Sequence, residues 1–250
     1  MERPKLDARG CVSNPASMIS VIGFDADDTL WHNESIFDAN HTRFCTLLSR
    51  YHDAKTVETT LYATELRNLD LYGYGVKGFA LSAIECAIEL TEGRISADEL
   101  REIVVFAKEM LSHPVELLDG VRETVEALAP EYRLFVITKG DLGHQERKLA
   151  ESGLARFFER REIVSEKDTL TYKRILAACG LQPGEFAMVG NSMKSDILPV
   201  LELGAHGIHV PYSLTWQGER AAAPEEGGSR YHTLATIRGV PDLIRRLNSG

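Results

Sequence analysis

Cysteine is scarce in this chain, with only four among 250 residues. They are Cys11, Cys45, Cys86 and Cys179, widely separated, without a CxxC pair and without the Cys/His spacing of a zinc site. This distribution argues against a disulfide framework and against a cysteine-based metal module. Free thiols in a reducing compartment are expected instead.

Long hydrophobic runs are absent as well. No stretch approaches the roughly 18 apolar residues that a membrane-spanning helix needs, and residues 1–17 contain no apolar segment of signal-peptide length. The composition, 44% hydrophobic and 26% charged, is that of an ordinary globular protein. We therefore expect a cytoplasmic protein with no membrane partner.

Positive charge is in deficit, with 28 Lys and Arg against 37 Asp and Glu, a formal net charge of −9 and a pI of about 5.4. A protein that holds nucleic acid through phosphate contacts needs a basic face, so no nucleic-acid partner is expected. The short basic cluster at residues 156–162 carries its own acidic residues, and we expect it to be a solvated helix end or loop. The sequence does not indicate an oligomeric state.

What is present is an alternation of strands and helices. Residues 18–25 form a short apolar run that stops abruptly at polar residues, which is typical of a buried strand. After residue 114, strand-like runs alternate with helical segments, which predicts a parallel sheet covered by helices on both faces, a three-layer Rossmann-like α/β core. The strands expected there are 132–138, 161–165, 185–191 and 205–211, and the helices are 120–128, 143–153, 170–180, 195–204 and 240–248.

A helical block interrupts this pattern directly after the first strand. Apolar residues recur at three- and four-residue intervals in segments 34–51, 56–72, 78–92 and 96–112. Ser96 and Glu99 have capping-box spacing, and Pro114 marks the exit. We therefore predict a flexible arm at 1–17, a core formed by 18–32 and 114–250, and a helical insert at 33–113. The stretch 217–230 is expected to be a loop.

Polar residues suited to phosphate chemistry follow four of the expected strands. In parallel sheets, ligands bind beyond the carboxyl ends of the strands. These positions hold Asp25, Asp27, Asp28 and Thr29 after the first strand, Thr138 to Asp141 after the second, Glu166 to Asp168 after the third, and Asn191, Ser192, Ser195 and Asp196 after the fourth.

Crowded carboxylates repel one another, and each resists ionisation beside the others. A Mg²⁺ ion, which prefers carboxylate oxygens, backbone carbonyls and water, could be shared by Asp25 and Asp196 and would offset this repulsion. Thr138 and the amide after it, that of Lys139, can donate hydrogen bonds to a phosphoryl group, and Lys167 can supply a compact positive charge. Such fixed donors stabilise a transferring phosphoryl group.

In their order along the chain, these residues resemble the four motifs of the haloacid dehalogenase (HAD) superfamily of phosphohydrolases. DADDT, residues 25–29, fits the first motif, DxDx(T/V). Thr138 in VITKG fits the second, a Thr or Ser that ends an apolar strand, and Lys167 in VSEKD is our choice for the Lys of the third. The stretch GNSMKSD, residues 190–196, matches the acidic fourth motif only in part. Together the motifs cover nearly the whole chain.

The resemblance implies a Mg²⁺-dependent hydrolase that uses an aspartyl-phosphate. Asp25 would be the nucleophile, and Asp27 the general acid that protonates the leaving group and then the base that activates water. The implied metal ligands are the Asp25 carboxylate, the Asp27 carbonyl and Asp196, and the implied phosphoryl-binding residues are Thr138, Lys139 and Lys167. Asn191 stands where the family usually has an acid. It can orient a metal-bound water or Lys167, but it adds no charge.

The helical insert resembles the family's type-1 cap, which would close over the substrate, exclude water and choose the leaving group. Its glycine-rich loop 71–78 carries Tyr72, Tyr74 and Lys77, which would face the site or merely link two helices. Tyr212 and Trp216 would line the entrance or simply pack. The sequence does not name the substrate.

Several other polar residues are expected to be structural. Asp28 is expected to form a turn or to place its charge at a helix N-terminus, and Thr29 is expected to stabilise the loop through hydrogen bonds. Lys173, the rival of Lys167, is expected at the surface, and the Lys139 side chain is expected to be solvated. The histidines are not spaced as metal ligands would be, and His41, His52, His206 and His209 are each expected to have no catalytic role.

The leading hypothesis is a Mg²⁺-dependent phosphatase that acts on a small phosphorylated metabolite. A haloacid dehalogenase needs no metal and lacks the second acid of the first motif, so Asp27 tells against it. A phosphonatase would need a cap lysine, for which Lys55 and Lys77 are poor candidates. A phosphomutase stays open because the same motifs serve it. A catalytically weak binding or regulatory protein is the other alternative, and Asn191 is its only hint.

Overall fold

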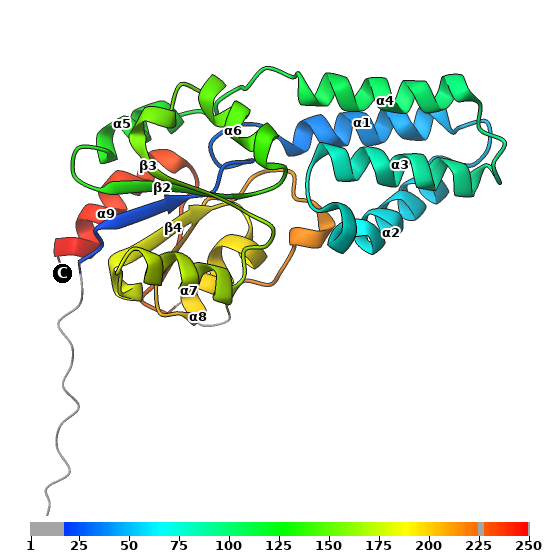
Figure 1. The fold of residues 1–250 in the computed structure, drawn as a ribbon. Coiled ribbons are helices and arrows are strands. Elements are labelled where there is room, and N and C mark those ends of the chain that lie inside the picture. The colour runs from blue at the N-terminus through cyan, green and yellow to red at the C-terminus, as the bar shows by residue number, and fades with distance from the viewer. Residues whose placement is uncertain (1–17, 225–227, 250) are drawn as a thin grey trace, which may run out of the picture.

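The computed structural model describes residues 18–224 and 228–249. Within them, six parallel strands form one sheet in the order β3-β2-β1-β4-β5-β6 (Figure 1). The strands are β1 (Val21–Phe24), β2 (Arg133–Lys139), β3 (Phe158–Val164), β4 (Phe186–Gly190), β5 (His206–His209) and β6 (Tyr231–Thr233). The predicted α/β class is confirmed, whereas the predicted arm at 1–17 lies outside the described residues.

Helices cover both faces of this sheet, which makes three layers. One hydrophobic cluster joins β1 to α5 (Val121–Leu128), α6 (Leu142–Glu151) and α9 (Val240–Ser249). A second joins the other face to α7 (Thr169–Ala178) and α8 (Leu198–Glu202). Ile22 and Phe24 belong to the first cluster and Val21 to the second, because successive side chains of a strand point to opposite faces. A strand buried on both sides explains the unbroken apolar run in the sequence.

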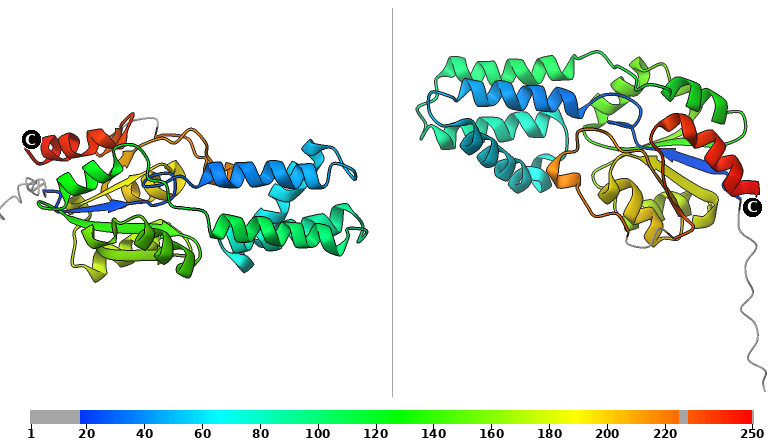
Figure 2. Two further views of the ribbon diagram at one scale, coloured as in Figure 1. Left: turned by 90° about the horizontal axis from the view of Figure 1, so that it is seen from above. Right: turned by 180° about the vertical axis from the view of Figure 1, so that it is seen from behind.

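Four helices between β1 and α5 form a separate bundle with its own core, and we call them the helical unit. They are α1 (Glu34–Leu47), α2 (Ala54–Tyr72), α3 (Val76–Leu90) and α4 (Ala97–Leu111). Their buried residues, among them Phe44, Leu61 and Ile103, pack on one another as a distinct cluster. Ser96 and Glu99 form the capping box at the start of α4, as predicted. Figures 1 and 2 show the bundle beyond the end of the sheet toward which β1 runs.

The expectation for residues 156–162 is wrong. They run from a 3-10 turn, Ala155–Phe157, into strand β3 at the edge of the sheet. Charged side chains are suited to an edge strand because they discourage pairing with other chains. Here they form ion pairs along the edge, Arg133–Glu159 at 2.7 Å and Arg160–Glu162 at 2.6 Å. The short strand β6, which follows the loop-like stretch 217–230, was not predicted either.

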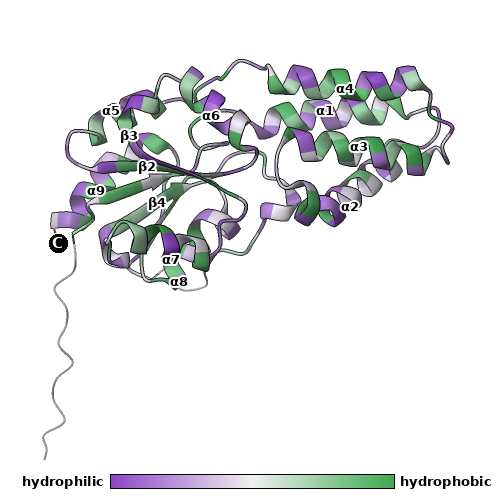
Figure 3. Cartoon of the chain, viewed as in Figure 1, coloured by the Kyte–Doolittle hydropathy of each residue, from purple (hydrophilic) through white to green (hydrophobic). Residues whose placement is uncertain are grey.

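Hydrophobic residues are concentrated in strands such as β4, whereas the helices of the bundle alternate between hydrophobic and hydrophilic residues (Figure 3). This alternation is what a helix with one buried face requires. Among the residues that the structure describes, no helix combines the length and the hydropathy needed to cross a bilayer.

The bundle core offers a matched test of its stability. Leu61 and Leu71 lie on the same helix, but Leu61 is 2% exposed and Leu71 is 78% exposed. We expect Leu61→Ala to lower the free energy of unfolding by about 2–5 kcal/mol, because it leaves a cavity in a packed core. Leu71→Ala should change it by less than about 0.5 kcal/mol. Urea denaturation followed by circular dichroism measures both, and equal losses would contradict the assignment of Leu61 to a packed core.

Candidate active site

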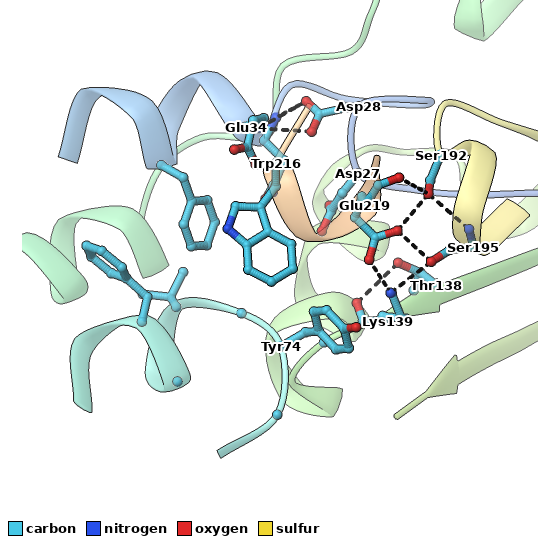
Figure 4. A pocket seen from close by; sticks show the side chains of 18 of the residues that line it. Asp27, Asp28, Glu34, Tyr74, Thr138, Lys139, Ser192, Ser195, Trp216 and Glu219 are labelled. Atoms are coloured by element: carbon cyan, nitrogen blue, oxygen red, sulfur yellow. Dashed lines mark hydrogen bonds and ion pairs between the residues drawn. The ribbon is translucent and has the colours of Figure 1, made fainter. Parts of the chain in front are cut away.

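The carboxyl ends of the strands open into a cavity of about 180 Å³ that the sheet and the helical unit line together. The strand-end residues reach it from four different loops, and they include Asp25, Asp27, Thr138, Lys139, Lys167, Asn191 and Asp196. Residues predicted from separate stretches of sequence therefore share one cavity. Figure 4 shows a part of its wall.

A buried lysine joins two of the aspartates. The ammonium nitrogen of Lys167 lies 2.6 Å from Oδ1 of Asp25 and 2.5 Å from Oδ1 of Asp196. Asp25 directly follows β1, Lys167 follows β3, and Asp196 lies in the π-helical turn Met193–Ile197 after β4. The side chains of Asp25, Lys167 and Asp196 are 8%, 3% and 0% exposed, so water screens this contact little.

The electrostatics of this cluster leave a deficit of positive charge. Burial raises the pKa of Asp25 to about 7, and the nearby Asp196 carboxylate adds to that effect, although Lys167 opposes it. Burial disfavours the charged form of Lys167, but Asp196 and Asp25 hold its pKa well above the ordinary value. One ammonium therefore faces two carboxylates, and the ionised cluster retains a negative charge.

The donor set fits Mg²⁺. Two carboxylates, neighbouring backbone carbonyls and the Asn191 side-chain oxygen are hard oxygen ligands, and Thr29 Oγ1 lies 3.3 Å from both Asp25 Oδ2 and Asn191 Oδ1. Among residues 18–224 and 228–249, no group of three or more His, Cys, Asp or Glu side chains is arranged to hold a metal by itself. Mg²⁺ usually takes only one or two protein carboxylates and fills its shell with water and substrate oxygens.

Asp27 is held by three donors that the sequence analysis did not identify as a set. Its Oδ1 accepts hydrogen bonds from Trp31 Nε1 at 2.7 Å and Lys148 Nζ at 2.6 Å, and its Oδ2 accepts one from Gln145 Nε2 at 2.9 Å. Burial would raise the pKa of Asp27, but Lys148 and the hydrogen bonds outweigh burial and lower it. Gln145 and Lys148 lie three residues apart on α6 and so share a face, a spacing that could have identified them.

Asp28 plays the structural role expected of it. Its φ of 61° is in the left-handed region that aspartate tolerates better than most residues. Its carboxylate accepts hydrogen bonds from the backbone nitrogens of Asn33 at 2.9 Å and Glu34 at 3.0 Å, at the start of α1 (Figure 4). The first turn of the helical unit is thereby fixed to the loop that carries Asp25 and Asp27.

Thr138 and Lys139 end β2, where they were expected, but the environment of Lys139 differs from the expectation. Thr138 is 3% exposed, and its hydroxyl accepts a hydrogen bond from Gln145 Nε2 at 3.1 Å. The prediction that the Lys139 side chain is solvated is wrong, because it is only 10% exposed. Its ammonium lies 3.1 Å from Glu166, 2.5 Å from Glu219 and 3.8 Å from the centre of the Tyr74 ring. These groups enclose it on several sides.

Glu219 also lines the cavity, although the sequence analysis did not identify it. It lies in a short turn, Gln217–Glu219, on the connection between β5 and β6. Its carboxylate accepts hydrogen bonds from Ser192 at 2.6 Å and Ser195 at 2.5 Å and pairs with Lys139 (Figure 4). No local pattern marks it, because the surrounding segment has the composition of a plain loop.

The segment 71–78, in which residues 73–75 join α2 to α3, contacts the sheet domain. Tyr74 donates a hydrogen bond to Glu166 at 2.8 Å, and Lys77 pairs with Asp141 at 2.8 Å. The Trp216 ring, carried by the same connection as Glu219, packs edge-on against Tyr62 of α2 and against Tyr74 at 5.9 and 6.2 Å between centroids. The bundle and the sheet domain therefore meet around the cavity, and Tyr72 lines it as well.

The remaining expectations concern lysines and histidines. Lys173 is exposed, in contrast to Lys167. His52 bonds to the Leu90 carbonyl oxygen, and His209 bonds to that of Asn191. His206 stacks on His232. His41, however, lines the cavity, where the helical pattern alone gave it no special place.

Comparison with known proteins gives consistent results. A family model described as a haloacid dehalogenase-like hydrolase matches residues 19–204. The N-acylneuraminate-9-phosphatase of Mus musculus is 26% identical over 245 residues, which cover 93% of this chain and 96% of that protein. A haloacid dehalogenase-like family hydrolase from Xanthomonas campestris is 43% identical, with a TM-score of 0.84 over 94% of each chain. A HAD hydrolase from Bacillus subtilis, bound to magnesium, shares the fold at 15% identity and a TM-score of 0.64, over 91% of this chain and 99% of its own.

The family match contains all four strand-end motifs, from Asp25 to Asp196, and the helical unit between the first two. The match covers strands β1 to β4, and the similarity to the Xanthomonas campestris hydrolase extends over 94% of this chain. The chain is therefore a hydrolase, and it belongs to the haloacid dehalogenase-like family.

Proposed function

We propose that the protein is a Mg²⁺-dependent phosphatase that hydrolyses a small phosphorylated metabolite through an aspartyl-phosphate at Asp25. The observation that carries the proposal is the Asp25–Lys167–Asp196 contact, with Asp27 two residues beyond the nucleophile in the same cavity. Similarity to an N-acylneuraminate-9-phosphatase supports phosphate ester hydrolysis over dehalogenation. Asp27 supports it too, since it supplies the proton that an alcohol leaving group needs and a halide does not.

In the first step, a carboxylate oxygen of Asp25 attacks phosphorus, and the bond from phosphorus to the alcohol oxygen breaks. Asp27 donates its proton to that oxygen, and the alcohol leaves. Lys167 favours the ionised form of Asp25 and orients it, while Thr138 and the Lys139 amide bind the phosphoryl oxygens. Donors that are fixed in advance stabilise the charge on the transferring group without reorganisation.

In the second step, water attacks phosphorus while Asp27 takes a proton from it. The bond from phosphorus to Asp25 breaks, so that free phosphate leaves and the carboxylate is restored. The lowered pKa of Asp27 favours the ionised form that this step uses. In the first step Asp27 must carry a proton, which requires its ion pair with Lys148 to loosen when the substrate is bound.

Bound Mg²⁺ would neutralise the excess negative charge of the cluster and of the phosphate dianion. Asp25, the Asp27 carbonyl and Asp196 would hold it, and the neutral oxygen of Asn191 would orient a coordinated water. Without a divalent ion, two carboxylates and a dianion would share one lysine, which is electrostatically unfavourable.

We propose that residues 33–113 act as a cap on a core of 18–32 and 114–250. The contacts of Tyr74 with Glu166 and of Lys77 with Asp141 support this, because they join the bundle to the catalytic loops over the cavity. A cap in this position would exclude water during the first step and admit it for the second.

A generic aryl phosphate tests the proposed function. We expect the purified protein to hydrolyse p-nitrophenyl phosphate with Mg²⁺ and to lose that activity when EDTA removes the metal. Asp25→Asn should reduce kcat to background, because the amide is not a nucleophile, while the exposed control Asp98→Asn should behave as the wild type. Release of p-nitrophenol is followed by absorbance. Turnover by Asp25→Asn at the wild-type rate would refute the proposal.

The role of Asp27 predicts a split between kcat and KM. Asp27→Asn should lower kcat by about 10²–10⁴-fold, because proton transfer contributes in the transition state, and should change KM for p-nitrophenyl phosphate much less. Steady-state kinetics at saturating Mg²⁺ measure both. A loss confined to KM would show that Asp27 serves binding alone.

Lys148 should act as a positioning residue. Lys148→Met removes the donor that lies 2.6 Å from Asp27, and we expect kcat to fall by about 10–100-fold through misplacement of that carboxylate. Lys173→Met on α7 is the matched control, because Lys173 is exposed. The two variants are compared by kcat, KM and melting temperature. A lower melting temperature with unchanged kcat in the Lys148 variant would assign it a purely structural role.

A further inference from the structure

The helical unit gives its part of the cavity a polar lining of particular chemistry. Glu34 and His41 come from α1, Glu65 comes from α2, and all three line the cavity. Glu34 and His41 are two helical turns apart, so they share one side of α1. Aromatic rings complete this part of the wall, and they are Phe37, Tyr74, Phe79 and Trp216.

Negative charge predominates among these polar groups. His41 Nε2 lies 3.5 Å from Glu65 Oε1. Burial would lower the pKa of His41, but Glu65 raises it above its ordinary value. Burial raises the pKa of Glu34 to about 7. Two acidic side chains thus lie beside one imidazole in this part of the cavity.

The basic side chains of the cavity are already paired. Lys139 contacts Glu219, Lys148 contacts Asp27, and Lys167 joins Asp25 to Asp196. Burial lowers the pKa of His144 to about 4, so its imidazole is neutral. Among the described residues that line the cavity there is no arginine. A carboxylate on the leaving group would therefore find no unpaired lysine and no arginine here, and His41, the remaining basic group, lies beside Glu65.

The cavity wall also contains acceptors that lack donors. Glu65 Oε2 and Gln145 Oε1 are buried and have no hydrogen-bond partner among the described residues. Gln145 is only 4% exposed, and its amide nitrogen is fully engaged with Asp27, Thr138 and the Lys139 carbonyl. Buried acceptors in native proteins are nearly always satisfied, so these two point to a ligand that brings O–H or N–H donors.

We infer that the protein selects phosphate monoesters whose leaving group carries hydroxyl or ammonium groups and no carboxylate. This inference rests on the proposed phosphatase function and names its substrate class. Hydroxyl or ammonium donors would satisfy Glu65 and Gln145 between the aromatic rings, whereas a carboxylate would meet Glu34 and Glu65 in a poorly solvated place. Acylneuraminates carry a carboxylate, so the substrate would differ in charge from that of the mouse relative.

Three six-carbon phosphates test the inference, because they share the phosphate position and differ in charge at the other end. They are glucosamine 6-phosphate, glucose 6-phosphate and 6-phosphogluconate. With Mg²⁺ and the whole chain, we expect kcat/KM for the first two to exceed that for 6-phosphogluconate by about tenfold or more, as like charges in an interface are strongly disfavoured. Their inhibition of p-nitrophenyl phosphate hydrolysis should follow the same order.

Variants locate the effect. Glu65→Gln and, separately, Glu34→Gln should each reduce the ratio of kcat/KM for glucose 6-phosphate to that for 6-phosphogluconate by about threefold or more at pH 8, where both carboxyls are ionised, because each removes one negative charge from the cavity wall. Glu58→Gln is the matched control, since Glu58 is an exposed glutamate two turns earlier on α2. It should leave the preference unchanged.

The outcomes separate this inference from the proposed function. The inference would be overturned if 6-phosphogluconate were used as well as the other two sugars or better, or if none of the three competed with the aryl phosphate. In either case, hydrolysis of the aryl phosphate would still support the proposed phosphatase function. Absence of aryl phosphate hydrolysis would overturn both. A substrate preference that neither Glu65→Gln nor Glu34→Gln alters would also contradict the inference, because residues other than these two would then determine it.

Discussion

The ammonium group of Lys167, buried between the carboxylates of Asp25 and Asp196, is the contact on which the site depends. Removing three charges from water is costly, and the cost is offset only when partners are held at close range. The sheet provides that constraint, because the adjacent parallel strands β1 and β4 end beside Asp25 and Asp196 at the same edge, and β3, which lies beyond β2, leads to Lys167. The hydrogen bond from the Ser192 amide to Asp196 fixes the second carboxylate from behind.

The strand ends were predictable from sequence, and the reason is physical. A strand buried on both faces is an apolar run, so the polar residue that ends it stands out, as Asp25 and Thr138 do. The helical unit was equally visible, since each helix repeats apolar residues at helical spacing. By contrast, the environment of Lys139 depends on Glu166, Glu219 and Tyr74, which come from three separate segments. Local sequence patterns carry no information about contacts between segments that are far apart in the chain.

Two other differences between the sequence-based predictions and the structure have the same cause. The basic cluster near residue 158 resembles a surface loop because an edge strand is also exposed and charged, and only its pairing with β2 makes it a strand. Glu219 lies in a segment with loop composition, yet its carboxylate completes a network with Ser192 and Ser195. Gln145 and Lys148 are intermediate cases. Their shared helical face is visible in sequence, but the group that they hold, Asp27, lies more than a hundred residues earlier.

In the proposed phosphatase, the balance of charge would also account for the asparagine at position 191. With two carboxylates and one ammonium, the cluster is already negative before a phosphate dianion enters. A third acid beside Thr29 would bind a cation more tightly, but it would add to the repulsion of the substrate. The amide oxygen of Asn191 would keep a hard oxygen ligand in the same place, 3.3 Å from the Thr29 hydroxyl, without adding charge. If the protein acts as proposed, a weaker hold on the metal would be exchanged for a weaker repulsion of the phosphate, and this exchange would matter most in a cavity whose lysines are all paired.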